Sequence, residues 1–400
     1  MEVRLSITNN LTLFWLCKGT TLSQSKCFVL LLIITALIGC KDQSSQKIQH
    51  AFSDISSHTP GCAVGIIKND RLAVEEYYGS SSLRYKVPIT EKTIFNIGSI
   101  SKHITTFLVL KLEQEGKLSR SDNLKSYYPD APDWFEDITI YHLIHHQSGL
   151  PDYLNNPKTR LKLNKALIHA PYLIDGVVSG VPIPTDVLTS AVISQMKSLS
   201  SAEFKSGFLA LYSNTGYLML ANIIEKVSGE SFRQLAEREV FHPLGMKSTT
   251  INGMRDTEIP WRATGYIADE DGQYFSSENY IISQGDGGVL TTLQDYAKWV
   301  QHMMKPHQDE ALWEVFLNPN DPEFGLAPTW NNSRLYRYSN GLIVSAIKGA
   351  NVYTHGGYSL DSMKSDFWFS PKLKLGYIQL CNYNTSRRVS VTDVIELYSQ

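Results

Sequence analysis

The order of hydrophobic patterns along the 400 residues restricts the fold more than any other feature of this sequence. Short alternating segments that are typical of strands occur early, at 62–67 and 72–78, and return after about residue 335. The region between them carries helical patterns broken by Pro and Gly, with few alternating segments. This order predicts one sheet built from both chain ends, with a mostly helical domain inserted between its strands.

Individual elements can be placed within this plan. The helix 101–115 has apolar residues at helical spacing, and Gly116 is well placed to cap its end. Further helices are expected at 216–227, 293–304 and 391–398. The closing strands are expected at 341–347, 351–354, 365–369 and 375–380.

The beginning of the chain has the pattern of an export signal. The apolar run 28–38 is too short to span a bilayer of roughly 30 Å as a helix, and it ends at Gly39 and Cys40. The residues Leu-Ile-Gly-Cys at 37–40 resemble the bacterial lipobox, in which the cysteine is acylated before cleavage. We expect residues 1–39 to be a lipoprotein signal peptide. Plain signal cleavage and a retained anchor are the alternatives.

The segment 40–58 is polar and rich in Ser and Gln, which suits a tether. We therefore expect a protein of the bacterial cell envelope that is held to the membrane by a lipid on Cys40 and faces the periplasm, with the outer membrane as the expected membrane. We divide the remaining chain into a sheet domain, 59–118 and 325–400, and a helical domain, 119–324.

Charge and composition limit the possible partners. The chain has 37 Lys and Arg against 39 Asp and Glu, and no basic run, so nucleic acid is not an expected partner. His142, His145 and His146 cluster, but neither HExxH nor CxxC occurs, so we expect structural histidines, no metal site and no cofactor. Cys62 and Cys381 either pair or pack as small buried side chains.

The strongest candidate for chemistry is Ser99 with Lys102. A serine and a lysine at i and i+3 lie on one helix face, so an unprotonated Lys102 can take the proton of Ser99. Spacing alone does not select this pair, because Ser-x-x-Lys also begins at Ser23, Ser44, Ser194 and Ser345. Ser99 follows a glycine at the start of a long amphipathic helix, where backbone N–H groups favour a developing anion.

Two further groups follow in the sequence. Tyr212 and Asn214 precede the helix 216–227, where the phenol could relay protons and the carboxamide could hold substrate or lysine. A turn with a half-buried tyrosine is the alternative, since Tyr-x-Asn recurs at 153 and 338. His355 and Gly357 lie at the end of a predicted strand, where glycines let a substrate approach the strand edge.

With these three groups in this order, the sequence resembles the class C β-lactamase-related serine hydrolases, which include D-alanyl-D-alanine carboxypeptidases, D-aminopeptidases and esterases. The resemblance runs from about 60 to 384. It extends to Leu-Ile-His-His-Gln-Ser-Gly-Leu-Pro at 143–151, Pro-Leu-Gly-Met at 243–246 and Gly-Gly-Val-Leu at 287–290. It implies an α+β fold, with an antiparallel sheet flanked by helices, an inserted helical domain and the site between the two.

The resemblance also implies a role for each site residue. Ser99 is the nucleophile, Lys102 its activator and Tyr212 the proton relay, while Asn214 donates to the substrate. His355 and Gly357 border the oxyanion strand, and the backbone N–H groups of Ser99 and Tyr358 form the oxyanion hole. The family's first and last strands pair, which places Cys62 beside Cys381 and leaves open whether they form a disulfide.

Relatives usually have Lys-Thr-Gly where this chain has His355-Gly356-Gly357. An imidazole with an unperturbed pKa near ~6.5 is largely neutral at pH 7, so we expect weak binding of carboxylates that strengthens toward pH ~6. We expect a monomeric serine hydrolase that acts through an acyl-enzyme on small molecules or peptides: esters, D-amino-acid amides or cell-wall peptides. The alternative is a non-catalytic penicillin- or peptidoglycan-binding sensor on the same fold.

Overall fold

A computed structural model describes residues 48–159, 173–174, 177–178, 183–253, 258–277, 283–305, 310–321, 323–330 and 333–398. The chain separates into two compact parts, 1–53 and 54–400, and all elements named below belong to the second part. Cys40 and the expected signal peptide lie outside the described residues. Within the described residues, no helix is both long and apolar enough to cross a bilayer.

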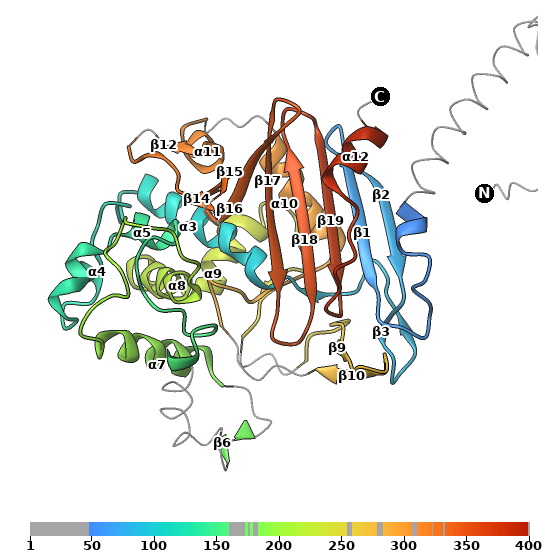
Figure 1. The fold of residues 1–400 in the computed structure, drawn as a ribbon, viewed down its shortest axis with the longest axis horizontal. Coiled ribbons are helices and arrows are strands. Elements are labelled where there is room, and N and C mark those ends of the chain that lie inside the picture. The colour runs from blue at the N-terminus through green and yellow to red at the C-terminus, as the bar shows by residue number, and fades with distance from the viewer. Residues whose placement is uncertain are drawn as a thin grey trace, which may run out of the picture. The chain divides into compact units, whose positions relative to one another are not determined.

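The main sheet has eight strands, and the pairings along it are antiparallel. Its spatial order is β14-β15-β16-β17-β18-β19-β1-β2, so strands from the two chain ends meet where β19 pairs with β1 (Figure 1). This confirms the predicted fold class. The strands are β1 (Cys62–Lys68), β2 (Arg71–Tyr78), β14 (Thr329–Trp330), β15 (Ser333–Ser339), β16 (Leu342–Ile347), β17 (Ala350–Tyr358), β18 (Lys364–Ser370) and β19 (Leu375–Cys381).

The junction of the two chain ends is closed covalently. Cys62 and Cys381 are register partners in the β1–β19 pair, with Cα atoms 4.1 Å apart, and they form a disulfide. The expectation that they lie on neighbouring strands is therefore confirmed, and the open question of the bond is answered by its presence. Both side chains are fully buried.

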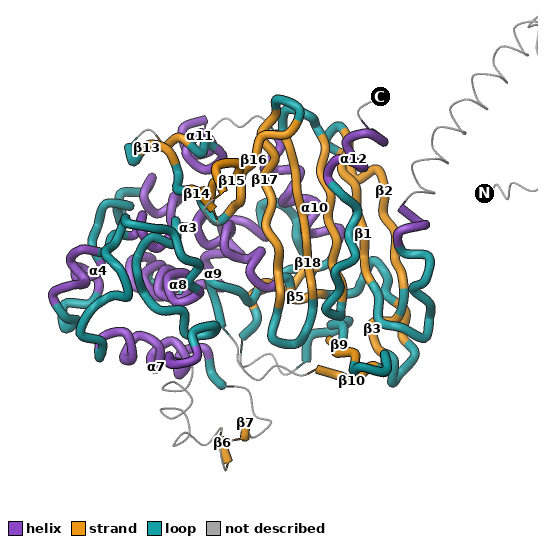
Figure 2. The backbone as a smooth tube through the Cα atoms, in the orientation of Figure 1, coloured by secondary structure: helices purple, strands orange, loops and turns teal. Residues whose placement is uncertain are grey.

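Helices cover both faces of this sheet. The helix α10 packs against β1 and β19 on one face, and α12 lies on the other (Figures 1 and 2). The Thr292 side chain caps the start of α10 by accepting from the N–H of Asp295. The helices are α3 (Lys102–Gln114), α4 (Leu124–Tyr127), α5 (Ile140–Ile144), α7 (Thr185–Lys197), α8 (Asn214–Ser228), α9 (Phe232–Ala236), α10 (Leu293–Met304), α11 (Glu310–Leu317) and α12 (Val391–Tyr398), with short helical segments η2 (Gly98–Ser101), η3 (Asp133–Asp137) and η4 (Glu237–Phe241).

The helix α3 connects the sheet to the helical region. Ten of its side chains are buried, because it packs against α8 and α11 while η2, which leads into it, abuts β17. Gly116, with φ +68°, follows its end as predicted. Short strands complete the fold: β3 (Ser80–Ser82), β4 (Val87–Pro88), β5 (Phe95–Asn96), β6 (Leu173–Ile174), β7 (Val177–Val178), β8 (Thr250–Ile251), β9 (Gly265–Ala268), β10 (Tyr274–Ser277), β11 (Val289–Thr291), β12 (Asn320–Asp321) and β13 (Gly325–Leu326).

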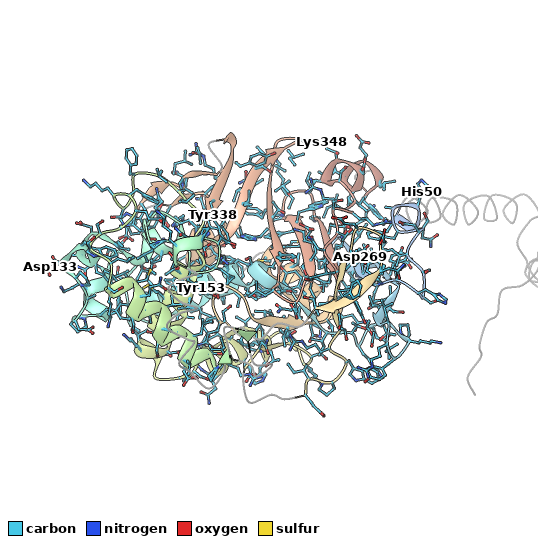
Figure 3. The ribbon with its side chains drawn as sticks, turned by 60° about the horizontal axis from the view of Figure 1, so that its bottom comes forward. His50, Asp133, Tyr153, Asp269, Tyr338 and Lys348 are labelled. Atoms are coloured by element: carbon cyan, nitrogen blue, oxygen red, sulfur yellow. A yellow bond between two sulfur atoms is a disulfide. The ribbon has the colours of Figure 1, made fainter. Side chains whose placement is uncertain are left out.

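Aromatic side chains fill the region where the helices meet the sheet. Tyr153 and Tyr338 are at most 1% exposed and lie in this interior, whereas Asp133 and Lys348 lie at the outside (Figure 3). The predicted strand at 351–354 is longer in the structure, since β17 continues through two glycines to Tyr358. His355 and Gly357 lie on this continuation of the strand.

Candidate active site

The nucleophile candidate Ser99 sits in η2, which is pressed against the end of β17. Gly98 adopts φ +53°, and a Cβ at this position would lie 2.7 Å from the carbonyl oxygen of Tyr358. A Cβ on Gly357 would collide with the carbonyl oxygen of Ile97. The two glycines therefore allow the backbone that carries Ser99 to touch the strand, and they place Ser99 beside the backbone of Tyr358.

Lys102 lies one turn further along the chain and is fully buried. Its Nζ is 3.2 Å from Ser99 Oγ, 2.8 Å from Asn214 Oδ1 and 2.6 Å from the carbonyl oxygen of Asp286. Burial lowers the pKa of Lys102 to about 8, although the nearby carboxylates of Asp286 and Asp152 act in the opposite direction. Lys102 can therefore supply a neutral amine near physiological pH.

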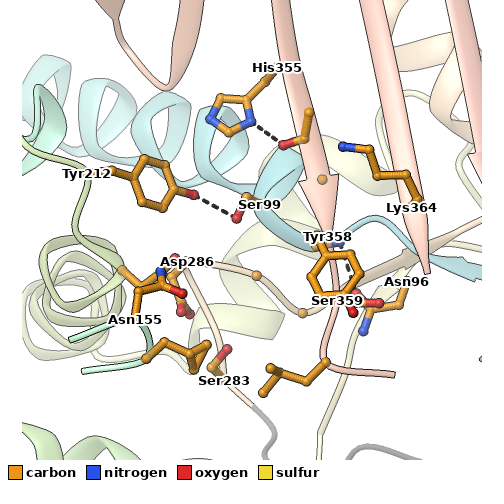
Figure 4. Close-up of a pocket in the computed structure, with 18 of the residues that line it drawn as sticks. Asn96, Ser99, Asn155, Tyr212, Ser283, Asp286, His355, Tyr358, Ser359 and Lys364 are labelled. Atoms are coloured by element: carbon orange, nitrogen blue, oxygen red, sulfur yellow. Dashed lines mark hydrogen bonds between the residues drawn. The ribbon is translucent and has the colours of Figure 1, made fainter. Parts of the chain in front are cut away.

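Tyr212 approaches Ser99 from the helical side of the site. Its hydroxyl donates to Ser99 Oγ at 2.7 Å, as the dashed line in Figure 4 shows. Burial raises the pKa of Tyr212 well above its ordinary value, so the phenol stays protonated and can act as a donor. The Nζ of Lys102 lies 4.8 Å from the centre of the Tyr212 ring, which brings all three groups together.

Asn214 is engaged with the protein on both sides of its amide. Its Oδ1 accepts from Lys102, and its Nδ2 donates to the carboxylate of Asp152 at 3.0 Å. Asp152 is itself held by the N–H of Leu154 and the side chain of Asn155. The amide oxygen thus holds the lysine, one of the two roles considered for Asn214. Its nitrogen carries two N–H groups and lines the cavity, so donation to substrate stays a prediction.

His355 lines the site, but it is only 5% exposed. Its Nδ1 lies 2.6 Å from the carbonyl oxygen of Gly356, and its Nε2 lies 3.3 Å from the hydroxyl of Tyr338. Burial, together with the charge of Lys102, lowers the pKa of His355 to about 3. The expected gain in carboxylate binding toward pH ~6 is therefore wrong, because the imidazole remains neutral at that pH.

The end of β17 is open on one edge. Strand β16 pairs with it only from Ala350 to Thr354, whereas β18 pairs with its other edge as far as Tyr358. The stretch 355–358 therefore presents an unpaired backbone edge beside Ser99. The Cβ position of Gly98 is 2.9 Å from the backbone nitrogen of Tyr358, so the Tyr358 amide lies close to the backbone that carries Ser99.

These residues surround one cavity of about 550 Å³ (Figure 4). It brings together the predicted residues Ser99, Tyr212, Asn214, His355, Gly357 and Tyr358, with Lys102 behind Ser99. Sequence reasoning did not single out several other residues that line it, namely Asn96, Asn155, Asn252, Ser283, Asp286 and Lys364. For Asp286 a signal existed, because it directly precedes the Gly-Gly-Val-Leu segment.

A polar chain fixes the backbone just before the nucleophile. Asn96 Oδ1 accepts from the N–H of Gly98 at 3.1 Å, and Asn96 Nδ2 donates to Asp361 Oδ1 at 3.3 Å. Asp361, which is 4% exposed, also pairs with Arg262. Because Asn96 both lines the cavity and holds Gly98, this chain couples the cavity wall to the position of Ser99.

A sequence profile of the family described as Beta-lactamase matches residues 44–399. The chain belongs to the beta-lactamase family. It is 28% identical to penicillin-binding protein 4* of Bacillus subtilis over 302 residues, which are 70% of this chain and 59% of that protein. It is 26% identical to a D-aminopeptidase of Brucella anthropi over 327 residues, 81% of this chain and 56% of that protein.

Solved structures agree on the fold of this family member. A penicillin-binding protein homologue from Pyrococcus abyssi, described as octameric, matches with a TM-score of 0.70 and 25% identity, over 89% of this chain and 76% of that one. The match to a penicillin-binding protein from Bacillus halodurans has a TM-score of 0.66 and 24% identity, over 88% and 97% of the two chains. The chain spans less than two thirds of the length of the curated relatives named above.

The histidine cluster has protein partners. His142 Nδ1 accepts from the N–H of Thr139, the Nδ1 of His145 lies 3.0 Å from the carbonyl oxygen of Tyr141, and His146 Nδ1 accepts from the N–H of Ser213. Among the described residues, no group of three His, Cys, Asp or Glu side chains is arranged to hold a metal ion.

Proposed function

We propose that this beta-lactamase-family serine hydrolase works through an acyl-enzyme on Ser99, with esters, D-amino-acid amides or cell-wall peptides as substrates. The observation that carries this proposal is the convergence of Lys102 Nζ and the Tyr212 hydroxyl on Ser99 Oγ, at 3.2 and 2.7 Å. A nucleophile with a base and a proton donor within hydrogen-bond reach is what acyl transfer requires.

In the proposed reaction, neutral Lys102 takes the proton of Ser99 as Oγ bonds to the substrate's carbonyl carbon. The carbonyl electrons move to oxygen, and the N–H groups of Ser99 and Tyr358 stabilise that oxyanion. When the carbonyl re-forms, the leaving group departs with a proton that passes from Lys102 through Tyr212. Water then attacks the acyl carbon and gives a proton to the same pair. As the bond between the acyl carbon and Oγ breaks, the pair returns this proton to Oγ, which releases the acid and free Ser99.

The pKa of Lys102 makes this scheme workable. With a pKa of about 8, roughly a tenth of the amines are neutral at pH 7, far more than for an exposed lysine. Asn214 and the carbonyl of Asp286 hold the amine toward Ser99. Burial of Lys102 thus lowers its pKa enough for the amine to act as a base.

The competing proposal is a sensor that is acylated but does not turn over. A fluorophosphonate probe marks the nucleophile, and timed mass spectrometry after acylation by a p-nitrophenyl acyl ester separates the two accounts. A hydrolase loses the acyl group to water and regains free Ser99, whereas a sensor keeps it. Ser99→Ala should abolish labelling, and an adduct on Ser194 or Ser345 would contradict the proposed nucleophile.

The natural substrate class is to be found by a screen. The screen covers nitrocefin, p-nitrophenyl acyl esters, D-alanyl-D-alanine peptides and D-amino-acid amides, with Ser99→Ala as the blank. Turnover of esters or amides that Ser99→Ala lacks supports the proposal. No Ser99-dependent turnover of any of the four would leave the sensor as the better account.

We also propose that the protein is a lipoprotein of the cell envelope, anchored through Cys40 and facing the periplasm. The support is the apolar run that ends at this cysteine and the polar segment after it. Metabolic labelling with an alkyne fatty acid should mark the full chain and not Cys40→Ala. Equal labelling of both proteins would refute the anchor.

A further inference from the structure

A basic side chain outside the predicted motifs lines the active-site cavity. Lys364, the first residue of β18, contributes to the wall of the cavity beside the end of β17 (Figure 4). Relatives usually have lysine at the position of His355. His355 is buried and neutral, so any cation offered to a substrate from this end of the cavity must come from another position.

We propose that Lys364 is a specificity-determining residue that binds a carboxylate of the substrate. This inference rests on the proposed function and refines its substrate class: esters or amides that carry a carboxylate near the bond to be cleaved. An ammonium group has three N–H donors and a full positive charge, which suits a carboxylate.

The register of the sheet brings Lys364 to this place. It pairs with Tyr358 across the β17–β18 ladder, and Asp366 pairs with Gly356. A Cβ built on Gly356 would lie 3.4 Å from Lys364 Nζ and 3.2 Å from Asp366 Oδ1. The lysine therefore extends over Gly356, a residue that itself lines the cavity.

The contact that Lys364 makes with the protein is a loose one. Its Nζ is 3.7 Å from Asp366 Oδ1, and the two side chains are 27% and 22% exposed. The pair is half-buried, but its separation exceeds that of a charge-assisted hydrogen bond. A substrate carboxylate could therefore bind the ammonium without breaking a strong internal bond.

The charges around the cavity fit this assignment. Of the described residues that line it, Lys364 is the one with an ammonium group. Lys102 does not belong to the lining, and its amine contacts Ser99. The acidic side chain in the lining, Asp286, accepts from Tyr153 at 2.9 Å and is 4% exposed. A substrate anion at the Lys364 end would thus be attracted to the ammonium, with Asp366, 3.7 Å from it, rather than this buried carboxylate as its competitor.

Two matched pairs of esters test the inference. In the first, phenylacetyl esters of 3-hydroxybenzoate and of methyl 3-hydroxybenzoate differ by one charge in the leaving group. In the second, the p-nitrophenyl monoester of glutaric acid and p-nitrophenyl valerate place the charge on the acyl side. The readout is the ratio of kcat/KM for charged over neutral ester, compared between the native protein and Lys364→Met.

For at least one pair, Lys364→Met should lower this ratio roughly ten-fold, mainly through KM, while neutral esters are turned over as before. Lys364→Arg should restore most of the ratio. Asp366→Asn, which breaks the same ion pair but keeps the cation, should preserve or raise it. Lys372→Met, on the turn after β18, serves as a distant control and should leave the ratio unchanged.

The outcomes separate this inference from the proposed function. If native protein hydrolyses neutral esters but Lys364→Met leaves both ratios unchanged, Lys364 does not bind the carboxylate. An equal loss in Lys364→Met and Asp366→Asn would also overturn it, since it would show a structural role of the pair. If no ester is hydrolysed, the proposed function fails. In that case the affinities for 3-carboxyphenylboronic acid and phenylboronic acid are measured instead. If the ratio of these two affinities is the same in Lys364→Met as in the native protein, the inference is refuted.

Discussion

At the scale of single residues, the buried amine of Lys102 determines how the rate depends on pH. Because the base form is required and the pKa is about 8, acylation should rise roughly ten-fold per pH unit below pH 7 and level off above about 9. Stopped-flow acylation by a chromogenic ester across pH 6 to 10 measures this. A profile that is flat from pH 6 to 8 would show that no amine with this pKa is the base.

Substitution provides a second test of Lys102. Lys102→Arg should lose about 100-fold or more in acylation rate, because guanidinium stays protonated and cannot accept the proton of Ser99. Lys111→Arg, near the other end of the same helix, is the matched control and should acylate normally. Near-native acylation by Lys102→Arg would assign the base to Tyr212 instead.

His355 leads to the opposite expectation. Its imidazole stays neutral across pH 6 to 8, so the ratio of kcat/KM for charged over neutral esters should change by less than about two-fold in this range. An inflection of that ratio near pH 6 that disappears in His355→Gln would show that the imidazole is protonated there after all.

Single residues also show what sequence reasoning can and cannot supply. Ser99, Lys102 and Tyr212 were found because their spacing and neighbours along the chain carry the signal. The lowered pKa of His355 was missed, because it follows from burial among residues that are distant in sequence, such as Tyr338 on another strand. Lys364 was missed because its importance arises from strand register, which pairs residues far from any motif.

At the scale of elements, the contact between η2 and β17 sets the geometry of the site. Gly357→Ala should destabilise the protein by about 1–3 kcal/mol and reduce activity, because its Cβ would push the strand away from Ile97 and Ser99. Urea unfolding and ester hydrolysis measure the two effects. In Gly356→Ala the new Cβ meets only the flexible ends of Lys364 and Asp366, so its stability should stay near native.

Native stability in Gly357→Ala would mean that the contact between η2 and β17 is not tight.

The strand β17 was only partly predictable. The strand signal ends at Thr354, since glycine has low strand propensity, yet β17 continues to Tyr358 because β18 supplies hydrogen-bond partners along that edge. Long amphipathic helices such as α10 were predicted with the correct ends, because their periodicity and caps are local.

At the scale of the whole molecule, the order of strand and helix patterns was enough to predict a sheet from both chain ends. It could not predict which polar residues converge on the cavity. Asp152 is joined to Lys102 by hydrogen bonds through Asn214, and Asp286 comes from a third region of the chain. Such contacts follow from packing between distant segments, and although Asp286 stands beside a recognisable motif, the sequence does not show that it meets Lys102.

The disulfide between Cys62 and Cys381 joins residues 319 positions apart and so closes nearly the whole folded chain into a loop. Because this link restricts the unfolded chain, its loss should lower the free energy of unfolding by about 2–5 kcal/mol. The β1–β19 pairing remains without it, so the reduced protein should keep its fold and its activity below the unfolding transition. Urea unfolding of the native protein and of Cys62→Ala/Cys381→Ala, each with and without dithiothreitol, measures this. The native midpoint should fall in the reductant while that of the double variant does not move, and equal midpoints for all four samples would show that the bond does not stabilise the closed sheet.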